Sequence, residues 1–163
     1  MEQITTPAPV PATFRYAGFW KRFVAWFIDQ IIMSAVSMII FIPFIGILGI
    51  STLRWNEIDE APASFLFAII GAYMMAVMLF FVIQWLYYAL MESRKGATFG
   101  KMALGILVVD MNGNPISFAR ATGRYFAKIL SGLILCIGYI IAGFTQQKQA
   151  LHDILAGCLV INK

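Results

Sequence analysis

Charged side chains are scarce in this chain. Of its 163 residues only 12% are Asp, Glu, Lys or Arg, whereas 61% are hydrophobic. Soluble domains have about 25% charged and about 45–50% apolar residues, so too few polar groups remain here to cover a water-facing surface. The composition excludes an ordinary soluble domain and predicts one integral membrane domain built around a few spanning segments.

Histidine and cysteine are scarce as well. The chain has one histidine, His152, and two cysteines, Cys136 and Cys158, which stand in apolar surroundings without a CxxC pair. Metal sites need clusters of such ligands, so we expect no metal and no cofactor, and we expect the cysteines to be small buried residues. No catalytic triad or pair of catalytic carboxylates can be assembled, so an enzyme is not expected.

The apolar residues fall into two long runs separated by a polar stretch. We predict a first spanning helix over 18–42, ended or kinked by Pro43, and residues 44–50 either follow the far interface or finish a tilted helix. A second run, 65–91, has no charged residue and is long enough to cross a membrane, so it predicts a second spanning helix. Residues 51–64 form the loop between them.

The remaining segments are shorter and more polar. Residues 1–16 contain Pro7, Pro9 and Pro11 and predict a disordered tail in front of a membrane domain over 17–161. Residues 92–117 form a polar loop in which 104–110 reads as a strand before an Asn-Gly turn. In the C-terminal segment 145–163, residues 157–161 are the obvious partner strand.

Residues 118–144 can be interpreted in two ways. Their first half is amphipathic, since Arg120, Arg124 and Lys128 recur every four residues, and it predicts a helix lying in the interface with these cations on anionic lipid headgroups. The apolar second half, 129–144, either spans with tilt or turns back as a re-entrant hairpin. The expected fold class is therefore all-α: two transmembrane helices, this third helical segment and a small cytoplasmic two-stranded sheet.

The distribution of basic residues predicts the orientation. Lysine and arginine concentrate before the first span and after the second, whereas the loop 51–64 has one basic and three acidic residues. Basic loops stay in the cytoplasm, so the N-terminus and 92–117 are expected on the cytoplasmic side of a cell inner membrane or a plasma membrane. Residues 51–64 are expected on the opposite side. Because the cations follow membrane-adjacent segments, they favour anionic lipid over nucleic acid.

Asp29 is the candidate functional residue with the clearest physical argument. It lies about ten residues into the first span, roughly 15 Å deep, where a carboxylate costs about 2.5–3.5 kcal/mol. Arg22 precedes it by seven residues, which places both on one helical face but two turns apart. The functional interpretation is an ion or proton site on Asp29 tuned by Arg22; the structural alternative is a bridge that fixes helix packing.

Other polar residues are weaker candidates. Gln30 and Ser34 on the first span, and Gln84 and Tyr88 on the second, could hydrogen-bond Asp29 or hold the helices together. His152 stands beside Asp153 and could titrate near neutral pH.

Four sequence blocks resemble the RDD family of membrane proteins. They are GFWKRFVAWFID at 18–29, TFGKMALGILVVD at 98–110, Arg120 with Arg124, and LHDILAGCLVI at 151–161. The resemblance covers about residues 17 to 161 in the expected order, with Met102 and Cys158 as small departures. It implies that the arginine and two aspartates of the family name are Arg22, Asp29 and Asp153. It also implies a compact membrane domain suspected of transport, in some members sodium/proton antiport, or of a scaffold role.

These observations lead to three functional hypotheses. The first is a small transporter, such as a cation/proton exchanger, in which Asp29 with Asp153 and Arg22 binds a monovalent cation or a proton. A chain this small is expected to form a homo-oligomer to enclose a pathway. The second is a non-enzymatic scaffold or assembly factor. The third is a lipid-binding membrane protein.

Overall fold

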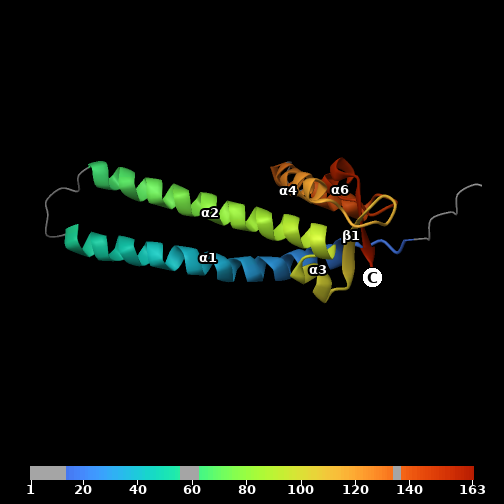
Figure 1. Cartoon of the computed structure of the whole chain (residues 1–163), viewed down its shortest axis with the longest axis horizontal. Helices are drawn as coiled ribbons and strands as arrows, with labels where there is room; N and C mark the ends of the chain where they lie inside the picture. Colours follow the sequence, from blue (N-terminus) through green and yellow to red (C-terminus); the bar gives the residue numbers. More distant parts are fainter. Residues whose placement is uncertain (1–13, 56–62, 134–136) are drawn as a thin grey trace, which may run out of the picture.

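Two long antiparallel helices dominate the computed structural model, which describes residues 14–55, 63–133 and 137–163 (Figure 1). They are α1 (Phe19–Trp55) and α2 (Ala63–Lys95). By length and composition both can cross a membrane, over Phe19–Ile47 and Ala63–Lys95. Large apolar side chains such as Ile39 (75% exposed) and Met75 (73%) point outward along them, as expected for helices surrounded by lipid. The predicted pair of apolar helices is confirmed.

The boundaries of these helices differ from the predicted ones. Pro43 lies inside α1, which continues to Trp55 instead of ending near residue 42. A proline removes one backbone donor, and apolar helices tolerate this when local adjustments satisfy the freed carbonyl. The second helix begins before residue 65 and extends past 91 to Lys95, so the predicted loop 51–64 is shorter. Residues 56–62 of that loop and 1–13 of the predicted tail lie outside the described residues.

Short elements fill one end of the hairpin (Figure 1). In chain order they are α3 (Phe99–Ala103), β1 (Ile106–Asp110), α4 (Phe118–Leu133), α5 (Ile137–Ile140), the 3-10 turn η1 (Ile141–Gly143), α6 (Leu151–Ala156) and β2 (Cys158–Asn162). The stretch 129–144 thus consists, in its described part, of the end of α4, α5 and η1 rather than one straight helix. Residues 134–136, which include Cys136, are outside that part.

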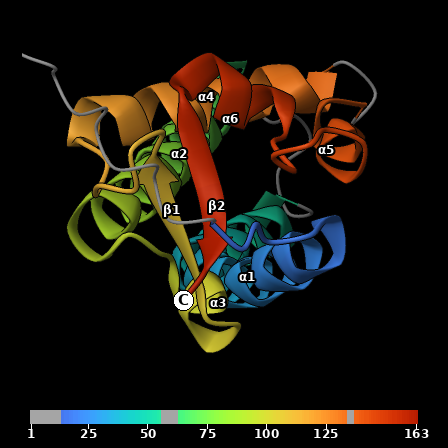
Figure 2. The same ribbon diagram turned by 90° about the vertical axis from the view of Figure 1, so that its right-hand side faces the viewer.

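The predicted strand pairing is confirmed. Strands β1 and β2 form an antiparallel pair in which Val108 lies opposite Val160, and Figure 2 shows them crossing between α4 and α1. The backbone N–H of Ala17 donates to the carbonyl of Val160 at 2.9 Å, so the chain entering α1 lies against β2. The polypeptide before the first span, the segment after the second and the C-terminus therefore meet at one end of the molecule.

The small hydrophobic core sits where the sheet meets the ends of the two long helices. It is built from alanines, which allow close approach of backbones, together with β-branched residues and one cysteine: Ala17, Ala25, Ala89, Ile106, Val108, Ile116, Ala121, Cys158 and Val160. Cys158 is fully buried, as predicted. This core fixes the ends of α1 and α2 against α4 and α6, and the polar site lies next to it.

Candidate functional site

Six charged side chains from five helices form one cluster at this end of the hairpin. We call it the charge cluster; it contains Arg22 of α1, Glu92 of α2, Lys101 of α3, Arg124 and Lys128 of α4, and Asp153 of α6. Only the fold brings these residues together, because they come from positions as far apart as 22 and 153. Helices α4 and α6 pack against each other and α4 packs on α2, which places the polar face of α4 inward.

Asp153 is the first of the two carboxylates that organise the cluster. Its Oδ2 accepts from Nη1 of Arg22, and its Oδ1 accepts from Nε and Nη2 of Arg124 at 2.8 and 2.6 Å. The backbone N–H of Ala150 donates to Oδ2 at 3.1 Å. Burial alone raises the pKa of Asp153, but Arg124 and Arg22 outweigh it and hold the pKa well below the ordinary range. Asp153 is therefore a permanent anion that joins α6 to α1 and α4.

Glu92 is the second carboxylate, and its side chain is only 1% exposed. It accepts from Nζ of Lys101 at 2.5 Å, Nη1 of Arg124 at 2.8 Å and Nζ of Lys128 at 3.3 Å. Three cations from two other helices thus neutralise a charge at the end of an apolar helix, which explains why α2 extends beyond the predicted boundary.

The predicted headgroup stripe on α4 needs correction. The Arg124 side chain is only 2% exposed and is held by Glu92 and Asp153, so it does not project from the outer surface of α4 as the predicted stripe requires. Lys128 is 19% exposed and also pairs with Glu92. Arg120, 45% exposed and 3.9 Å from Asp110, is the one member of the predicted stripe that faces outward. The carboxylates of α2 and α6 attract this face of α4 inward.

Asp29 belongs to a separate site, in which its hydrogen-bond donors are uncharged. Its Oδ1 accepts from the hydroxyl of Tyr87 and the backbone N–H of Gly100, both at 2.8 Å, and its Oδ2 accepts from the hydroxyl of Thr98 at 2.6 Å. None of the described contacts joins Asp29 to Arg22 or Asp153, so the three residues do not form one site. Asp29 instead connects α1 to the loop and helix that carry Lys101.

Gly100 makes this connection possible. A Cβ at this position would overlap the carbonyl oxygen of Ala25 and lie 3.0 Å from Cγ of Asp29. The absence of a side chain therefore lets the backbone of α3 lie directly on α1, and it positions the neighbouring Lys101 to reach Glu92.

His152 is buried beside the charge cluster. Its Nδ1 lies 3.5 Å from Oγ of Ser131, its Nε2 lies 3.4 Å from Oδ1 of Asp153, and its ring is 5.2 Å from that of Tyr139. Burial lowers the pKa of His152 to about 3, although Asp153 opposes this effect. This lowered pKa favours a neutral imidazole and does not support the predicted titration near neutrality.

The weaker polar candidates do not gather around Asp29. Ser34 donates within its own helix to the carbonyl of Ile31 at 2.8 Å, and Gln84 accepts from the hydroxyl of Tyr125 at 3.2 Å. The Tyr88 hydroxyl is buried and has no hydrogen-bond partner among the described residues, while Nζ of Lys128 lies 4.4 Å above its ring. In the described part of the chain, Ser34, Gln84 and Tyr88 form no hydrogen bond with Asp29.

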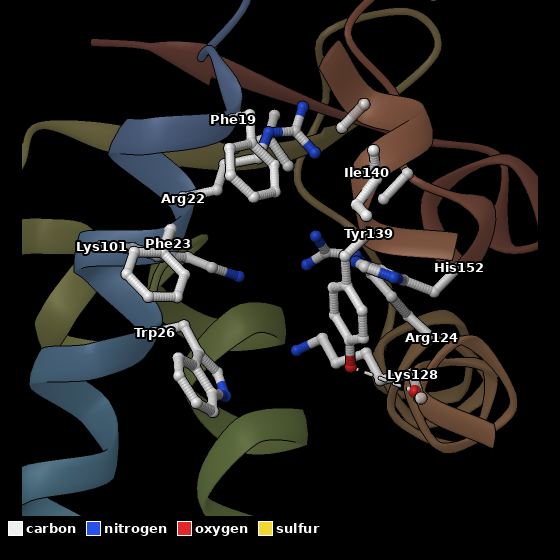
Figure 3. A pocket seen from close by; sticks show the side chains of 14 residues that line it. Phe19, Arg22, Phe23, Trp26, Lys101, Arg124, Lys128, Tyr139, Ile140 and His152 are labelled. Carbon is white, nitrogen blue, oxygen red and sulfur yellow. Dashed lines mark hydrogen bonds between the residues drawn. The ribbon is translucent and has the colours of Figure 1, made fainter. Parts of the chain in front are cut away.

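A pocket of about 510 Å³ opens beside the charge cluster (Figure 3). We call it the cationic pocket. Its charged lining consists of Arg22, Lys101, Arg124 and Lys128, whose nitrogen atoms point toward the same space, and no aspartate or glutamate is among its described lining residues. Its outer wall is aromatic and apolar: Phe19, Phe23, Trp26, Tyr139 and Ile140.

Each positive charge around the pocket destabilises the charged form of its neighbours. Burial, then Arg124 and Lys128, lower the pKa of Lys101 to about 7 against the opposing effect of Glu92. Burial lowers the pKa of Lys128 in the same direction. Arg124 behaves oppositely, because Asp153 and Glu92 outweigh its burial and raise its pKa. The lysines therefore gain from any further negative charge placed in the pocket.

Sequence reasoning missed several members of this site. Glu92 and Lys101 were not singled out, nor were Tyr87, Thr98 and Ser131. Glu92 did carry a signal, because it ends an uncharged run of spanning length. The described residues contain no group of three His, Cys, Asp or Glu side chains arranged to hold a metal ion.

One family model matches most of the chain. The model described as RDD family matches residues 16–157. A Bacillus subtilis (strain 168) protein named "Uncharacterized protein YxaI" is 37% identical over 90% of this chain and 97% of its own length. "Uncharacterized membrane protein YteJ" from the same organism is 27% identical over 93% of this chain and 84% of its own. "Uncharacterized protein YckC" is 24% identical over 90% and 85%, respectively. No solved structure matches.

Proposed function

The chain belongs to the RDD family of membrane proteins, and we propose that its function is to bind an anion in the cationic pocket. The observation that carries this proposal is the charge balance of the site. Among the described residues, four cations line the pocket, and two carboxylates, Glu92 and Asp153, pair with them. Counting Asp29, which accepts only from neutral donors, still leaves an excess of positive charge.

A second feature supports an anion as the ligand. Nη2 of Arg22 is buried and has no hydrogen-bond partner among the described residues, although Nε donates to the carbonyl of Ala17 at 3.0 Å. An unpaired buried guanidinium donor costs more than an ordinary unsatisfied group. Arg22 lines the pocket, and an anion there satisfies this donor together with the lysines.

The location of the pocket follows from the proposed topology. Two spans return the chain to its original side, which agrees with the packing of the N-terminal residues against β2. We place this end in the cytoplasm of a bacterial inner membrane or plasma membrane, because the basic residues concentrate there. Helix α4 then lies at the interface, with Phe126 and Ile129 exposed toward the lipid.

The test is anion-dependent stabilisation of the purified full chain in detergent micelles. Inorganic phosphate replaces chloride at constant ionic strength, and the thermal unfolding midpoint is measured. Binding stabilises the fold by about 1.4 kcal/mol at ten times Kd, so the midpoint should rise and saturate. Lys128→Gln should weaken this response. Lys21→Gln is the control, because Lys21 is exposed beside the site and bonds Asn162 instead.

Two results contradict the proposal. One is a midpoint that does not respond to phosphate beyond the effect of chloride. The other is an equal response in wild type and Lys128→Gln, since a site without Lys128 is not the cationic pocket.

Cation/proton exchange and a scaffold role stay predictions. For exchange, proton-coupled cation flux into proteoliposomes should be lost in Asp29→Asn; unchanged flux in that variant sinks the idea. The hydrogen bonds that surround Asp29 give exchange less support than the excess of cations gives anion binding. A scaffold role predicts co-purification of a fixed partner without flux, and self-association is tested by the mass of the purified particle.

A further inference from the structure

We infer that the anion is the phosphate of a bilayer glycerophospholipid with a net negative charge, which enters the cationic pocket from the membrane. This inference rests on the proposed function and narrows it to a ligand class. The shared chemistry is a phosphate or phosphate ester, and it could come from the cytosol or from a lipid headgroup. Two observations favour the lipid: the wall of the pocket and a second cavity beneath it.

The wall of the pocket on the α1 side is aromatic and open to the surroundings of the helix. Phe23 is 44% exposed and Trp26 is 47% exposed, and Trp20 next to them is 74% exposed. Aromatic residues of this kind mark the level of the membrane–water interface at the start of a span. The pocket therefore lies at the depth of the lipid phosphates, with an apolar side toward the bilayer.

A second cavity of about 280 Å³ adjoins the first. The two share Trp26, Lys128, Gly132 and Tyr139 in their linings. The second cavity lacks further cations and instead presents neutral polar groups of the spans: Gln30, Gln84 and Tyr88. Of these, Tyr88 is 6% exposed, and its hydroxyl has no partner among the described residues. A neutral donor in this position suits a neutral acceptor such as an ester carbonyl.

The order of the two cavities along the spans matches the order of groups in a phospholipid. On α1 the first cavity is lined over residues 19–26 and the second over 26–30, and on α2 the second is lined at Gln84 and Tyr88, before Glu92. The neutral cavity thus lies about one helical turn, roughly 5 Å, nearer the bilayer centre. In a lipid of the same leaflet, ester carbonyls lie beneath the phosphate, and the acyl chains continue along the apolar surface of the hairpin. A free phosphate uses only the first cavity.

The experiment compares lipids and soluble phosphates on the full chain in detergent micelles. Native mass spectrometry measures retention of dioleoyl phosphatidylglycerol against dioleoyl phosphatidylcholine, and glycerol phosphate is titrated as a competitor. We expect at least tenfold preferential retention of the anionic lipid, a loss of about tenfold in Lys128→Gln, and a loss of several-fold in Tyr88→Phe. Phenylalanine keeps the ring and removes only the unpartnered hydroxyl, so this variant should fold. Arg120→Gln, which removes an exposed cation of the same helix, is the control.

Three other outcomes would overturn the lipid inference, and one of them would also overturn anion binding. Binding of phosphate or glycerol phosphate without retention of phosphatidylglycerol overturns the lipid inference and leaves anion binding intact. Retention that responds to Arg120→Gln but not to Lys128→Gln or Tyr88→Phe indicates surface association and also overturns it. Binding of neither lipid nor soluble phosphate overturns both proposals.

Discussion

Replacing Glu92 by glutamine tests whether the charge cluster holds the two spans to the short elements. Glutamine has nearly the same shape, so the variant removes a charge without making a cavity. The remaining cations then face one another with Asp153 as their only carboxylate in the cluster. We expect a loss of folding free energy concentrated at this end of the hairpin.

The size of the effect follows from burial and contacts. The Glu92 side chain is 1% exposed and lies 2.5, 2.8 and 3.3 Å from the nitrogens of Lys101, Arg124 and Lys128. Removing one partner of a buried ion pair costs about 3–5 kcal/mol. Lys101 limits the loss because its pKa is already about 7 and falls further without Glu92. Releasing its proton relieves part of the repulsion, so we expect about 3 kcal/mol.

The pH dependence has a definite sign. Between the folded pKa of Lys101 and its unfolded value of about 10.4, the unfolded chain binds more protons, so stability rises with pH. In wild type this window opens at about 7, and in Glu92→Gln it opens lower. The difference in free energy of unfolding between wild type and Glu92→Gln should therefore be larger at pH 6 than at pH 8.

The free energy of unfolding is measured by titrating the full chain in mixed micelles with dodecyl sulfate at both pH values. Arg94→Gln is the matched control, because Arg94 is exposed on the same helix turn and should change stability by no more than about 0.5 kcal/mol. If Glu92→Gln behaves like this control, or if its deficit does not change with pH, the reasoning about the cluster is refuted.

Two further predictions use the same assay. Asp29→Asn should cost about 1–2 kcal/mol of folding free energy, since the amide oxygen still accepts from Tyr87 and Gly100 and the hydroxyl of Thr98 can accept from the amide. Asp29→Ala should cost more, because it leaves three donors unmatched at about 1–3 kcal/mol each. Equal costs of the two variants contradict the hydrogen-bonding role. His152 is neutral in the folded state down to a pKa of about 3, but the unfolded chain protonates near 6.5, so stability should fall by about 1.4 kcal/mol per pH unit below that value. His152→Gln should remove this slope, and an unchanged slope assigns it to other groups.

Much of the architecture could be predicted from local features of the sequence. The two apolar runs predicted the hairpin. The short apolar runs before the Asn-Gly turn and at the C-terminal end predicted the pairing of β1 with β2, because a short apolar run bounded by turn residues is a local signal. Burial of Cys158 followed from its neighbours in the same way. The end of α1 was left open at Pro43, and the structure agrees with the alternative in which the helix continues past the proline, although α1 runs on to Trp55 rather than to residue 50.

Which side chains pair with each other in the site could not be predicted from local sequence. Arg22 and Asp29 share a helical face by periodicity, yet Arg22 pairs with Asp153 and Asp29 pairs with neutral donors from α2 and the start of α3. The spacing on α4 showed an amphipathic helix without showing which way its basic face points. That direction depends on the carboxylates of two other helices, and their positions exist only after packing.

The amino-acid sequence by itself was enough to predict a hairpin of two long apolar helices with a small two-stranded sheet, and it showed that charged residues are few. Periodicity and composition act over a few residues, so they can be recognised without a fold. The tertiary structure alone decided which charges meet, because ion pairs between residues 22 and 153 or 92 and 124 require the helices to be docked. It also decided that four cations share two carboxylates around one pocket, the imbalance from which the proposed function follows.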